Sequence, residues 1–180
     1  MNIPVSTERL DLILANRKIL ESDLGDRTEL ARLLHAEIPA AWPPPLIDEG
    51  VIREFIRMSL PASGPVFAAW YWVLNDPLDG RRVLIGNGGI LGVENVPDTA
   101  VLGYSVLDEY QNRGYATEAV RALIPEIFSL PGIRRIIATT YPDLRASIRV
   151  LEKNGFVRTD QVPAGTGAEE GTVCFVREKS

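Results

Sequence analysis

The sequence predicts an α/β protein whose mixed sheet is flanked by helices, and three observations support this prediction. Residues 66–74, 83–93 and 101–107 are apolar runs bounded by turn clusters, as expected of neighbouring strands. From Ala116 the apolar positions change to a helical spacing, which predicts a helix directly after a short polar loop. A further strand and helix follow, so we expect a meander of antiparallel strands that continues in β–α–β–α order.

Length and composition exclude several classes of protein. The 180 residues suit one domain, residues 1–180, with its own core. No apolar run approaches the roughly 18–20 residues of a membrane span, and the first residues lack the pattern of a signal peptide, so we expect no membrane partner. Cys174 is the only cysteine, which excludes an internal disulfide and fits a cytoplasmic location.

Charge is unevenly distributed along the chain. The net charge of −5 argues against nucleic acid as a partner. Residues 111–153 nevertheless hold seven basic and four acidic side chains, a net charge of +3, so the rest of the chain carries −8. An anionic ligand would be attracted to the basic segment and a cationic ligand to the remainder.

The chain is expected to open with a strand and a helix. Residues 7–14 place leucines on alternate positions, the pattern of a strand with one apolar side. Ser22–Asp23 predicts the N-cap of a helix that carries a leucine stripe as far as Leu34. His35, the only histidine, falls near the end of this helix. The sequence pattern indicates no acidic residue as its catalytic partner.

A proline-rich loop and a second amphipathic helix follow. Prolines on both sides of Trp42 predict an extended loop. Residues 47–60 carry apolar side chains at helical spacing and predict a helix that Pro61 and Gly64 end. Trp42 either contacts a substrate or caps the core, and the sequence leaves both interpretations open.

Tight turns are expected to join the central strands. Residues 75–80 form a turn cluster between the first two apolar runs. Three glycines, at positions 86, 88 and 89, predict a bulge or a close backbone approach within the strand 83–93. The segment Glu94–Asp98 then turns the chain into the next strand.

The last third of the chain alternates helix and strand. Pro125 predicts a kink or a break in the helix after the polar loop. Residues 133–140 are rich in β-branched side chains and predict a strand, and Asp143 predicts the cap of a helix over residues 145–154. Two short apolar runs predict a final hairpin. They are residues 156–159 and 172–176.

The polar loop has the composition of a phosphate site. Gly114 and Ala116 are small enough for a ligand to approach the backbone. The start of the following helix presents unpaired N–H groups and about half a positive charge, and Arg113 adds a full charge beside it. The loop matches neither a Walker A motif nor G-x-G-x-x-G, so an ordinary strand-to-helix turn also stays open on these residues alone.

A resemblance to a known family decides between these interpretations. The pattern Gln111-x-x-Gly114-x-Ala116 resembles the pyrophosphate loop of the GCN5-related N-acetyltransferases (GNAT). The longer string over residues 103–119 resembles the RimJ/RimL-like branch of that family, and residues 7–10, Thr-Glu-Arg-Leu, resemble the start of the same branch.

The resemblance implies a fold and a cosubstrate. The fold is a GNAT-like, mostly antiparallel sheet of about seven strands, splayed between strands 4 and 5 and flanked by about four helices. The cosubstrate is acetyl-CoA, with no metal. Main-chain groups at Val106 and Leu107 are expected to hold the pantetheine arm and the thioester carbonyl. The pyrophosphate is expected on the loop residues Gln111, Asn112, Arg113, Gly114, Tyr115, Ala116 and Thr117.

The resemblance also suggests catalytic residues. The segment 147–156 resembles the family motif S-x-x-x-L/Y-E-K-x-G-F, which implies that Ser147 contacts the cofactor and protonates the leaving thiolate. The attacking amine needs a base, and Glu94, at the end of the strand 83–93, is the candidate. Two positions depart from the family pattern: Leu144 replaces an asparagine that often contacts the cofactor, and Leu151 replaces a tyrosine that often protonates the thiolate.

These residues predict an N-acetyltransferase that moves an acetyl group from acetyl-CoA directly to a primary amine in a ternary complex. The acceptor is either a protein N-terminus or a small-molecule amine, and whether the chain forms a homodimer is open. Because leucine at position 151 cannot donate a proton, a non-catalytic acyl-CoA-binding or sensing domain remains the alternative.

Overall fold

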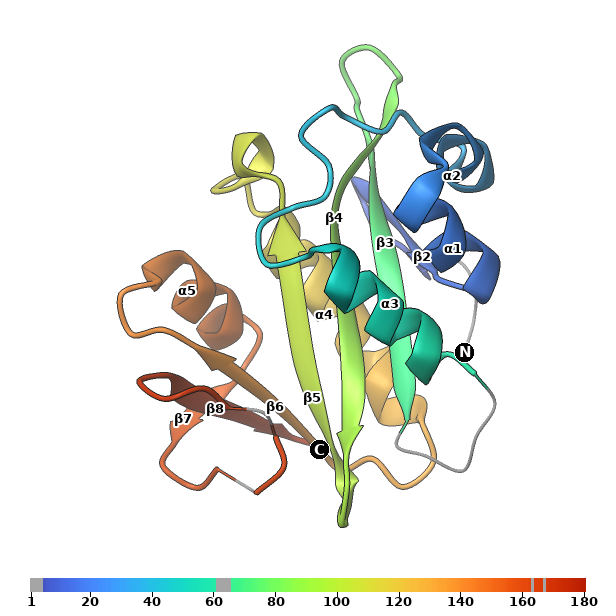
Figure 1. The fold of residues 1–180 in the computed structure, drawn as a ribbon. Coiled ribbons are helices and arrows are strands. Elements are labelled where there is room, and N and C mark those ends of the chain that lie inside the picture. The colour runs from blue at the N-terminus through green and yellow to red at the C-terminus, as the bar shows by residue number, and fades with distance from the viewer. Residues whose placement is uncertain (1–4, 61–65, 163, 167) are drawn as a thin grey trace.

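The computed structural model describes residues 5–60, 66–162, 164–166 and 168–180. Among these, eight strands form one sheet in the order β1-β2-β3-β4-β5-β6-β8-β7 (Figure 1). The strands are β1 (Val5–Ser6), β2 (Leu10–Leu14), β3 (Phe67–Asn75), β4 (Arg82–Val93), β5 (Val96–Val106), β6 (Arg135–Thr140), β7 (Val157–Thr159) and β8 (Val173–Glu178). The helices are α1 (Arg17–Gly25), α2 (Arg27–Leu34), α3 (Glu49–Met58), α4 (Tyr115–Ser129) and α5 (Arg145–Lys153), with a 3₁₀ turn, η1, at Asp108–Tyr110.

The predicted sheet is confirmed in class and order. Strands β2 to β5 are successive antiparallel neighbours, and β5 is followed by α4 and by β6, which lies parallel to β5. The final hairpin of β7 and β8 is also present. The described residues form eight strands rather than about seven, because the two-residue β1 pairs with β2 at the edge of the sheet.

The first helical segment differs from the prediction. Two helices occupy it, and their caps are Asn16 and Asp26, whose side chains accept hydrogen bonds from the N–H groups of Ile19 and Glu29 at 3.0 and 2.9 Å. The predicted cap at Ser22–Asp23 is wrong, because both residues lie inside α1. The predicted cap of α5 at Asp143 is also wrong. Leu144 occupies the N-cap position of that helix, and no side chain accepts a hydrogen bond there. A side-chain cap lowers the cost of starting a helix, but packing decides where it starts.

Two predictions concerned the effect of proline on helices. The helix α4 runs from Tyr115 to Ser129 without the break predicted near Pro125. Pro125 is exposed, so the carbonyl group that loses its partner there can bind water. The helix α3 ends at Met58, and Pro61 and Gly64 lie outside the described residues.

Each face of the sheet carries its own core. Alternate side chains of β3 point to opposite faces, so Trp70 and Trp72 enter one core while Tyr71 and Val73 enter the other. The first core lies between the sheet and α4 and α5, and the second lies beneath α1 and α2. In Figure 1 α3 crosses in front of the sheet and α4 lies behind it.

The glycine cluster of β4 has both predicted features. A register shift interrupts the pairing of β3 and β4 between Trp72 and Val73. A Cβ atom at Gly88 would lie 2.6 Å from the ring of Trp72, and one at Gly89 would lie 2.8 Å from the carbonyl oxygen of Ala68. The glycines therefore let a large indole lie across β4. No helix among the described residues is long and apolar enough to cross a membrane.

Candidate functional site

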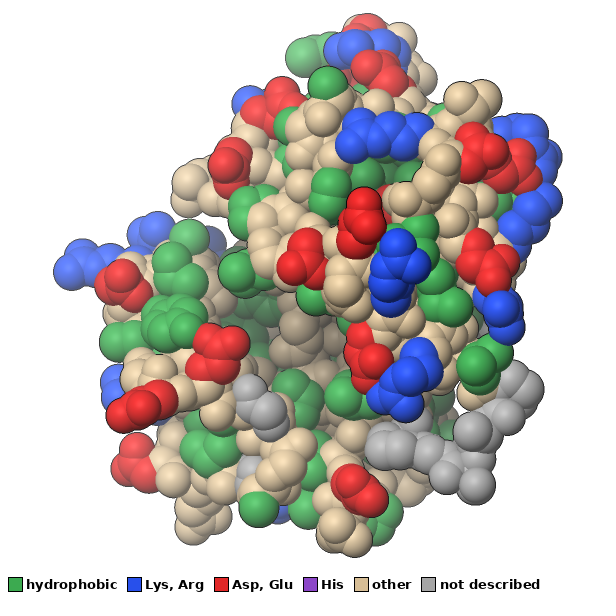
Figure 2. Space-filling model, viewed as in Figure 1, with side chains coloured by type: hydrophobic (Ala, Val, Ile, Leu, Met, Phe, Trp, Pro, Cys, Tyr) green, Lys and Arg blue, Asp and Glu red, His purple; other side chains and the backbone are tan. Residues whose placement is uncertain are grey.

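The strands β5 and β6 separate along their length. They pair only at Thr99–Arg135, Ala100–Ile136 and Val101–Ile137. Beyond these pairs β5 continues to Val106 and β6 to Thr140. In this part the facing edges of the two strands form no pairs with each other (Figure 1). Counted from β2, these are the fourth and fifth strands, and the predicted splay is confirmed. Figure 2 shows the surface hollowed between the side of α5 and the side of α3.

The end of β5 directs main-chain groups into this opening. The N–H of Leu107 donates to the carbonyl oxygen of Ile85 at 2.8 Å, so it faces β4 and is occupied. Because successive amides of a strand alternate in direction, the N–H of Val106 faces the opening. The side-chain amide of Gln111 donates to the carbonyl oxygen of Val106 and to Asp108 Oδ1, both at 3.0 Å. Gln111 thus braces the strand end and begins the loop.

The loop before α4 presents unpaired amides. Asn112 and Gly114 have φ values of +59° and +85°, and these two left-handed residues turn the chain sharply into the helix. Within the described part of the chain, the backbone N–H groups of residues 112–117 have no hydrogen-bond acceptor. The side chain of Arg113 is exposed and lies against the ring of Tyr110, with 5.8 Å from its guanidinium carbon to the ring centre. The loop can bind an anion through main-chain donors.

Arg9 braces this loop from beneath. Its guanidinium pairs with Glu118 (Nε to Oε2, 2.8 Å), donates to the carbonyl oxygen of Arg113 at 3.1 Å, and lies 4.5 Å from the centre of the Tyr115 ring. The Thr7 hydroxyl and the Arg9 N–H both donate to Glu118 Oε1, at 2.6 and 2.9 Å. We call Thr7, Arg9 and Glu118 the clasp. The clasp thus joins the Thr-Glu-Arg-Leu motif to the loop motif.

The electrostatics of the clasp favour the ionised carboxylate. Burial alone would raise the pKa of Glu118, but hydrogen bonds from Thr7 and Arg9 and the charge of Arg9 together lower it below its ordinary value.

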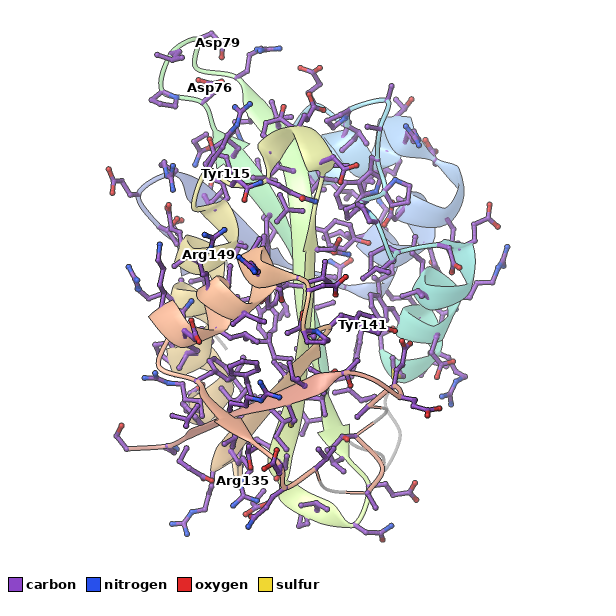
Figure 3. All side chains as sticks on the ribbon, turned by 90° about the vertical axis from the view of Figure 1, so that its left-hand side faces the viewer. Asp76, Asp79, Tyr115, Arg135, Tyr141 and Arg149 are labelled. Atoms are coloured by element: carbon purple, nitrogen blue, oxygen red, sulfur yellow. The ribbon has the colours of Figure 1, made fainter. Side chains whose placement is uncertain are left out.

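Asn154 holds the other side of the first turn of α4. Its buried side-chain amide donates to the carbonyl oxygens of Thr117 and Val150 at 3.2 and 2.8 Å, and so ties α5 to that turn. Figure 3 views these elements from the side, with Tyr115 on α4 and Arg149 on α5.

Ser147 lies in the first turn of α5 and contacts the opposite strand. The hydroxyl of Tyr104, on β5, lies 3.2 Å from Ser147 Oγ and 3.4 Å from the Ser147 carbonyl oxygen. Leu151, one turn later, is 1% exposed and belongs to the core, whereas Leu144 is about half exposed at the start of the helix. The structure therefore brings Ser147 to the opening beside β5, with a phenol next to it.

Other candidates lie elsewhere. Glu94 is exposed at the tip of the β4–β5 hairpin. Gly88 pairs with Tyr104, and the six residue steps from Gly88 to Glu94 correspond to about 20 Å of strand, so the structure does not bring Glu94 to Ser147. His35 ends α2 in the left-handed conformation, and Cys174 is a buried side chain of β8.

Trp42 closes the core beneath the proline-rich loop. It is 3% exposed, and its indole N–H donates to Asp23 Oδ1 at 2.7 Å, while the hydroxyl of Tyr71 donates to Asp23 Oδ2 at 2.5 Å. Burial raises the pKa of Asp23, and these two hydrogen bonds oppose that effect. Of the two interpretations, the structure favours Trp42 as a cap on the core.

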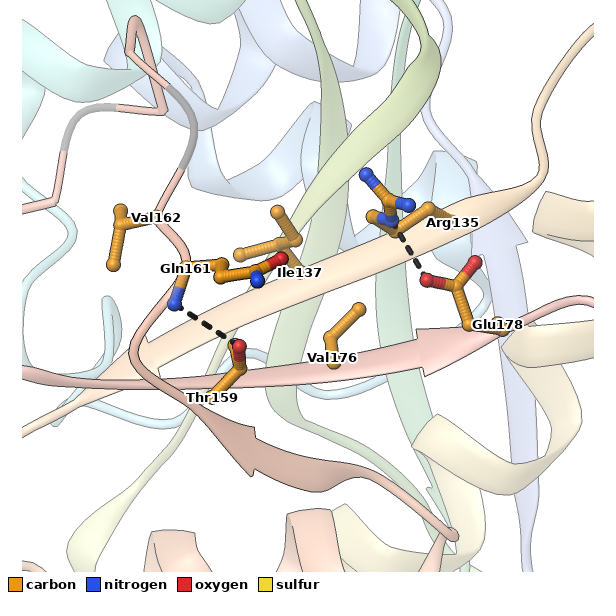
Figure 4. A pocket seen from close by; sticks show the side chains of 7 residues that line it. All are labelled: Arg135, Ile137, Thr159, Gln161, Val162, Val176 and Glu178. Carbon is orange, nitrogen blue, oxygen red and sulfur yellow. Dashed lines mark hydrogen bonds and ion pairs between the residues drawn. The ribbon is translucent and has the colours of Figure 1, made fainter.

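Two concavities lie near these elements. One, of about 460 Å³, separates the proline-rich loop from the end of β5, and two of its lining side chains, Asp108 and Glu109, are acidic. The other, of about 230 Å³, lies on β6 and β8, where the Arg135–Glu178 ion pair closes one side (Figure 4). No group of three or more potential metal ligands occurs among the described residues.

Sequence reasoning missed three residues of this site. Arg9 lies in a motif that the sequence reveals, but its contact with the loop could not be predicted, because its partner Glu118 is 109 positions away. Tyr104 was assigned only to a strand, and Asn154 only to a helix end. The motifs mark all three segments, but only the fold shows which side chains meet.

The chain is similar to acetyltransferases. Residues 17–157 match the acetyltransferase (GNAT) domain family. The uncharacterized N-acetyltransferase YoaA of Bacillus subtilis is 34% identical over 75 residues, which cover 42% of each chain, so the match spans less than half of that relative. The uncharacterized N-acetyltransferase YjdG of the same organism is 25% identical over 85% of this chain and 89% of its own length.

A solved structure shows the same fold. The structure of RimL, a ribosomal L7/L12 alpha-N-protein acetyltransferase in complex with coenzyme A, superposes with a TM-score of 0.63 at 17% identity, over 97% of both chains. At this identity the similarity concerns the fold.

Proposed function

The chain belongs to the GNAT acetyltransferase family, and we propose that it transfers an acetyl group from acetyl-CoA directly to a primary amine. The observation that carries this proposal is the pairing of two features: unpaired amides at residues 112–117 and a splayed sheet edge that starts beside them. A diphosphate on the amides would leave the pantetheine arm free to enter between β5 and β6.

Each part of coenzyme A then has a counterpart in the chain. The pyrophosphate meets the loop of Gln111, Asn112, Arg113, Gly114, Tyr115, Ala116 and Thr117, where Arg113 supplies charge and the main chain supplies donors. The pantetheine amides pair with the free edge of β5 near Val106, as an added strand would. The thioester lies near Ser147, whose hydroxyl is the proton donor for the leaving thiolate.

The amine approaches from the face of α1 and α3. Its attack on the thioester needs no nucleophilic side chain, because the amine itself is the nucleophile. Since Glu94 is distant, we assign the loss of the amine proton to water, and positioning of the two substrates supplies much of the rate. Asp108 and Glu109 beside the proline-rich loop favour a cationic acceptor. RimL, which shares the fold, acts on a protein α-amine, and a protein N-terminus is the acceptor we propose to test first.

The proposal is tested by following thiol release from acetyl-CoA in the presence of N-terminal peptides and of small-molecule amines. We expect release with at least one acceptor class, together with an acetylated product of 42 Da greater mass, the mass of the added C₂H₂O. Tight binding of coenzyme A without thiol release from any amine would instead indicate a binding or sensing domain. Loss of coenzyme A binding would contradict both.

A further inference from the structure

Tyr104 occupies an unusual place in the sheet. It lies three residues beyond Val101, the last residue of β5 that pairs with β6, so it pairs with Gly88 of β4 on one side and borders the opening on the other. Its side chain is on the face of α4 and α5, and its hydroxyl reaches Ser147 on α5. Tyr104 thus bridges the two sides of the splay at the residue to which the proposed function assigns the proton.

The ring of Tyr104 is held by a second aromatic side chain. Trp72 of β3 lies across β4 because Gly86 and Gly88 have no side chains there. Its ring stacks on that of Tyr104 at a centroid distance of 6.4 Å and an interplanar angle of 24°. The phenol is therefore fixed by packing, independently of its hydrogen bond, and its hydroxyl has a defined direction.

The hydroxyl stays protonated under working conditions. Burial raises the pKa of Tyr104 to about 12, and the hydrogen bond with Ser147 opposes this shift only in part. A neutral phenol next to Ser147 Oγ remains a hydrogen-bond donor over the pH range in which the acceptor amine is reactive. The other family position for a phenol, residue 151, is a leucine packed into the core.

From this arrangement we propose that Tyr104 is the positioning residue of the transfer step. In the transfer step its hydroxyl, 3.2 Å from Ser147 Oγ, turns to donate to that oxygen, which directs the serine proton towards the leaving sulfur and stabilises the oxygen as that proton departs. The inference rests on the proposed function, because it assigns Ser147 the role of donor.

The step balances as follows. The amine nitrogen forms a bond to the thioester carbon, and the carbon–sulfur bond breaks with its electron pair on sulfur. The sulfur takes the proton of Ser147 Oγ, and Oγ recovers a proton that the amine has released to water. Tyr104 remains protonated throughout and changes only the strength of its hydrogen bond.

The first test is a double-mutant cycle. Tyr104→Phe keeps the ring stack on Trp72 and removes one oxygen. We expect kcat to fall at least about 10-fold, while KM for acetyl-CoA changes less than about twofold, since a positioned proton donor contributes ~10²–10⁴-fold. Because Tyr104 acts through Ser147, Tyr104→Phe combined with Ser147→Ala should be no slower than Ser147→Ala alone. Losses that multiply in the double variant overturn the inference.

The second test varies the leaving group. S-acetyl-N-acetylcysteamine releases an alkyl thiol that needs a proton, whereas S-phenyl thioacetate releases a more acidic aryl thiol that departs readily as the thiolate. The kcat loss of Tyr104→Phe should shrink to less than about twofold with the aryl thioester, which bypasses the proton transfer. A purely structural role for Tyr104 predicts equal losses with both thioesters, and that result would overturn the inference.

A control and the wild-type chain complete the experiment. Tyr141→Phe, in a side chain labelled in Figure 3, removes a phenolic hydroxyl that donates to Glu169 and not to Ser147, and it should leave the ratio of the two thioester rates unchanged. Wild-type protein that releases no thiol from acetyl-CoA with any amine refutes the proposed function, and the inference with it. An active wild-type protein whose Tyr104→Phe variant matches it refutes the inference alone.

Discussion

At the scale of single residues, the clasp residue Arg9 separates cofactor binding from chemistry. Its guanidinium holds the main chain of the loop at Arg113 and the carboxylate of Glu118, yet nothing places it near the thioester. A change at Arg9 should therefore affect the pyrophosphate end of acetyl-CoA and leave the acyl end unaffected.

The corresponding prediction compares a long and a short thioester. Arg9→Met should raise KM for acetyl-CoA about 10-fold, because losing one charge-assisted brace of an anion site costs on the order of 1–2 kcal/mol. KM for S-acetyl-N-acetylcysteamine, which lacks the pyrophosphate, should change less than about twofold. Arg135→Met is the matched control, since it breaks an exposed ion pair with Glu178 at the end of β6 that still pairs with β5. Equal effects on both thioesters would contradict this role.

Glu118 gives the clasp a pH dependence with a definite sign. Its pKa is lowered in the folded protein, so the ionised carboxylate stabilises the fold above the unfolded-state pKa of about 4.3. That contribution is lost as the pH falls through the lowered folded-state pKa. Urea unfolding from pH 7 to pH 3 should show a decrease in the free energy of unfolding in the acid range that is smaller in Glu118→Gln. An identical pH dependence in the two proteins would contradict the assignment.

At the scale of elements, the packing of α5 shows why the leucine at position 151 cannot simply be replaced by the tyrosine of the family motif. Leu151 is packed against the first core, while Ser147, one turn earlier, reaches the opening. The same helix face thus serves the core and the site within four residues.

A tyrosine at position 151 should therefore lower the stability of the protein without increasing its activity. Leu151→Tyr adds a larger, polar side chain to a closed core and should lower the free energy of unfolding by about 1–3 kcal/mol. It should not raise kcat, because Tyr104 already presents a phenol to Ser147. Chemical denaturation and thiol-release kinetics check both parts, and Leu151→Met serves as the control of similar volume. A stable variant with a higher kcat would show that the phenol was missing after all.

The same scale shows what the sequence could and could not predict. Strands β3, β4 and β5 were predictable because each is an apolar run bounded by turn residues. The division of α1 from α2 was not, since Asp26 interrupts a leucine stripe that alone suggests one helix. The loop before α4 was predictable from its local pattern, whereas the pairs Arg9–Glu118 and Tyr104–Ser147 join residues 109 and 43 positions apart. Such pairs depend on how the sheet folds.

At the scale of the whole molecule, the splay makes cofactor binding a property of the sheet. The loop is attached to α4, the opening is bordered by β5 and β6, and the clasp connects the loop and α4 to the first strands of the chain. Coenzyme A bound across these parts would bridge β5 and β6, which pair with each other at only three residue positions.

Binding should therefore stabilise the whole fold. At a concentration 100 times its dissociation constant, coenzyme A should add about 2.7 kcal/mol to the free energy of unfolding, which corresponds to an increase in Tm of roughly 5–10 °C for a chain of this size. Inorganic pyrophosphate, which fills the loop without entering the splay, should give a smaller increase, because it leaves the pantetheine contacts unmade. Thermal unfolding with each ligand measures the two parts separately. Equal shifts for both ligands would mean that the edge of β5 contributes nothing to binding.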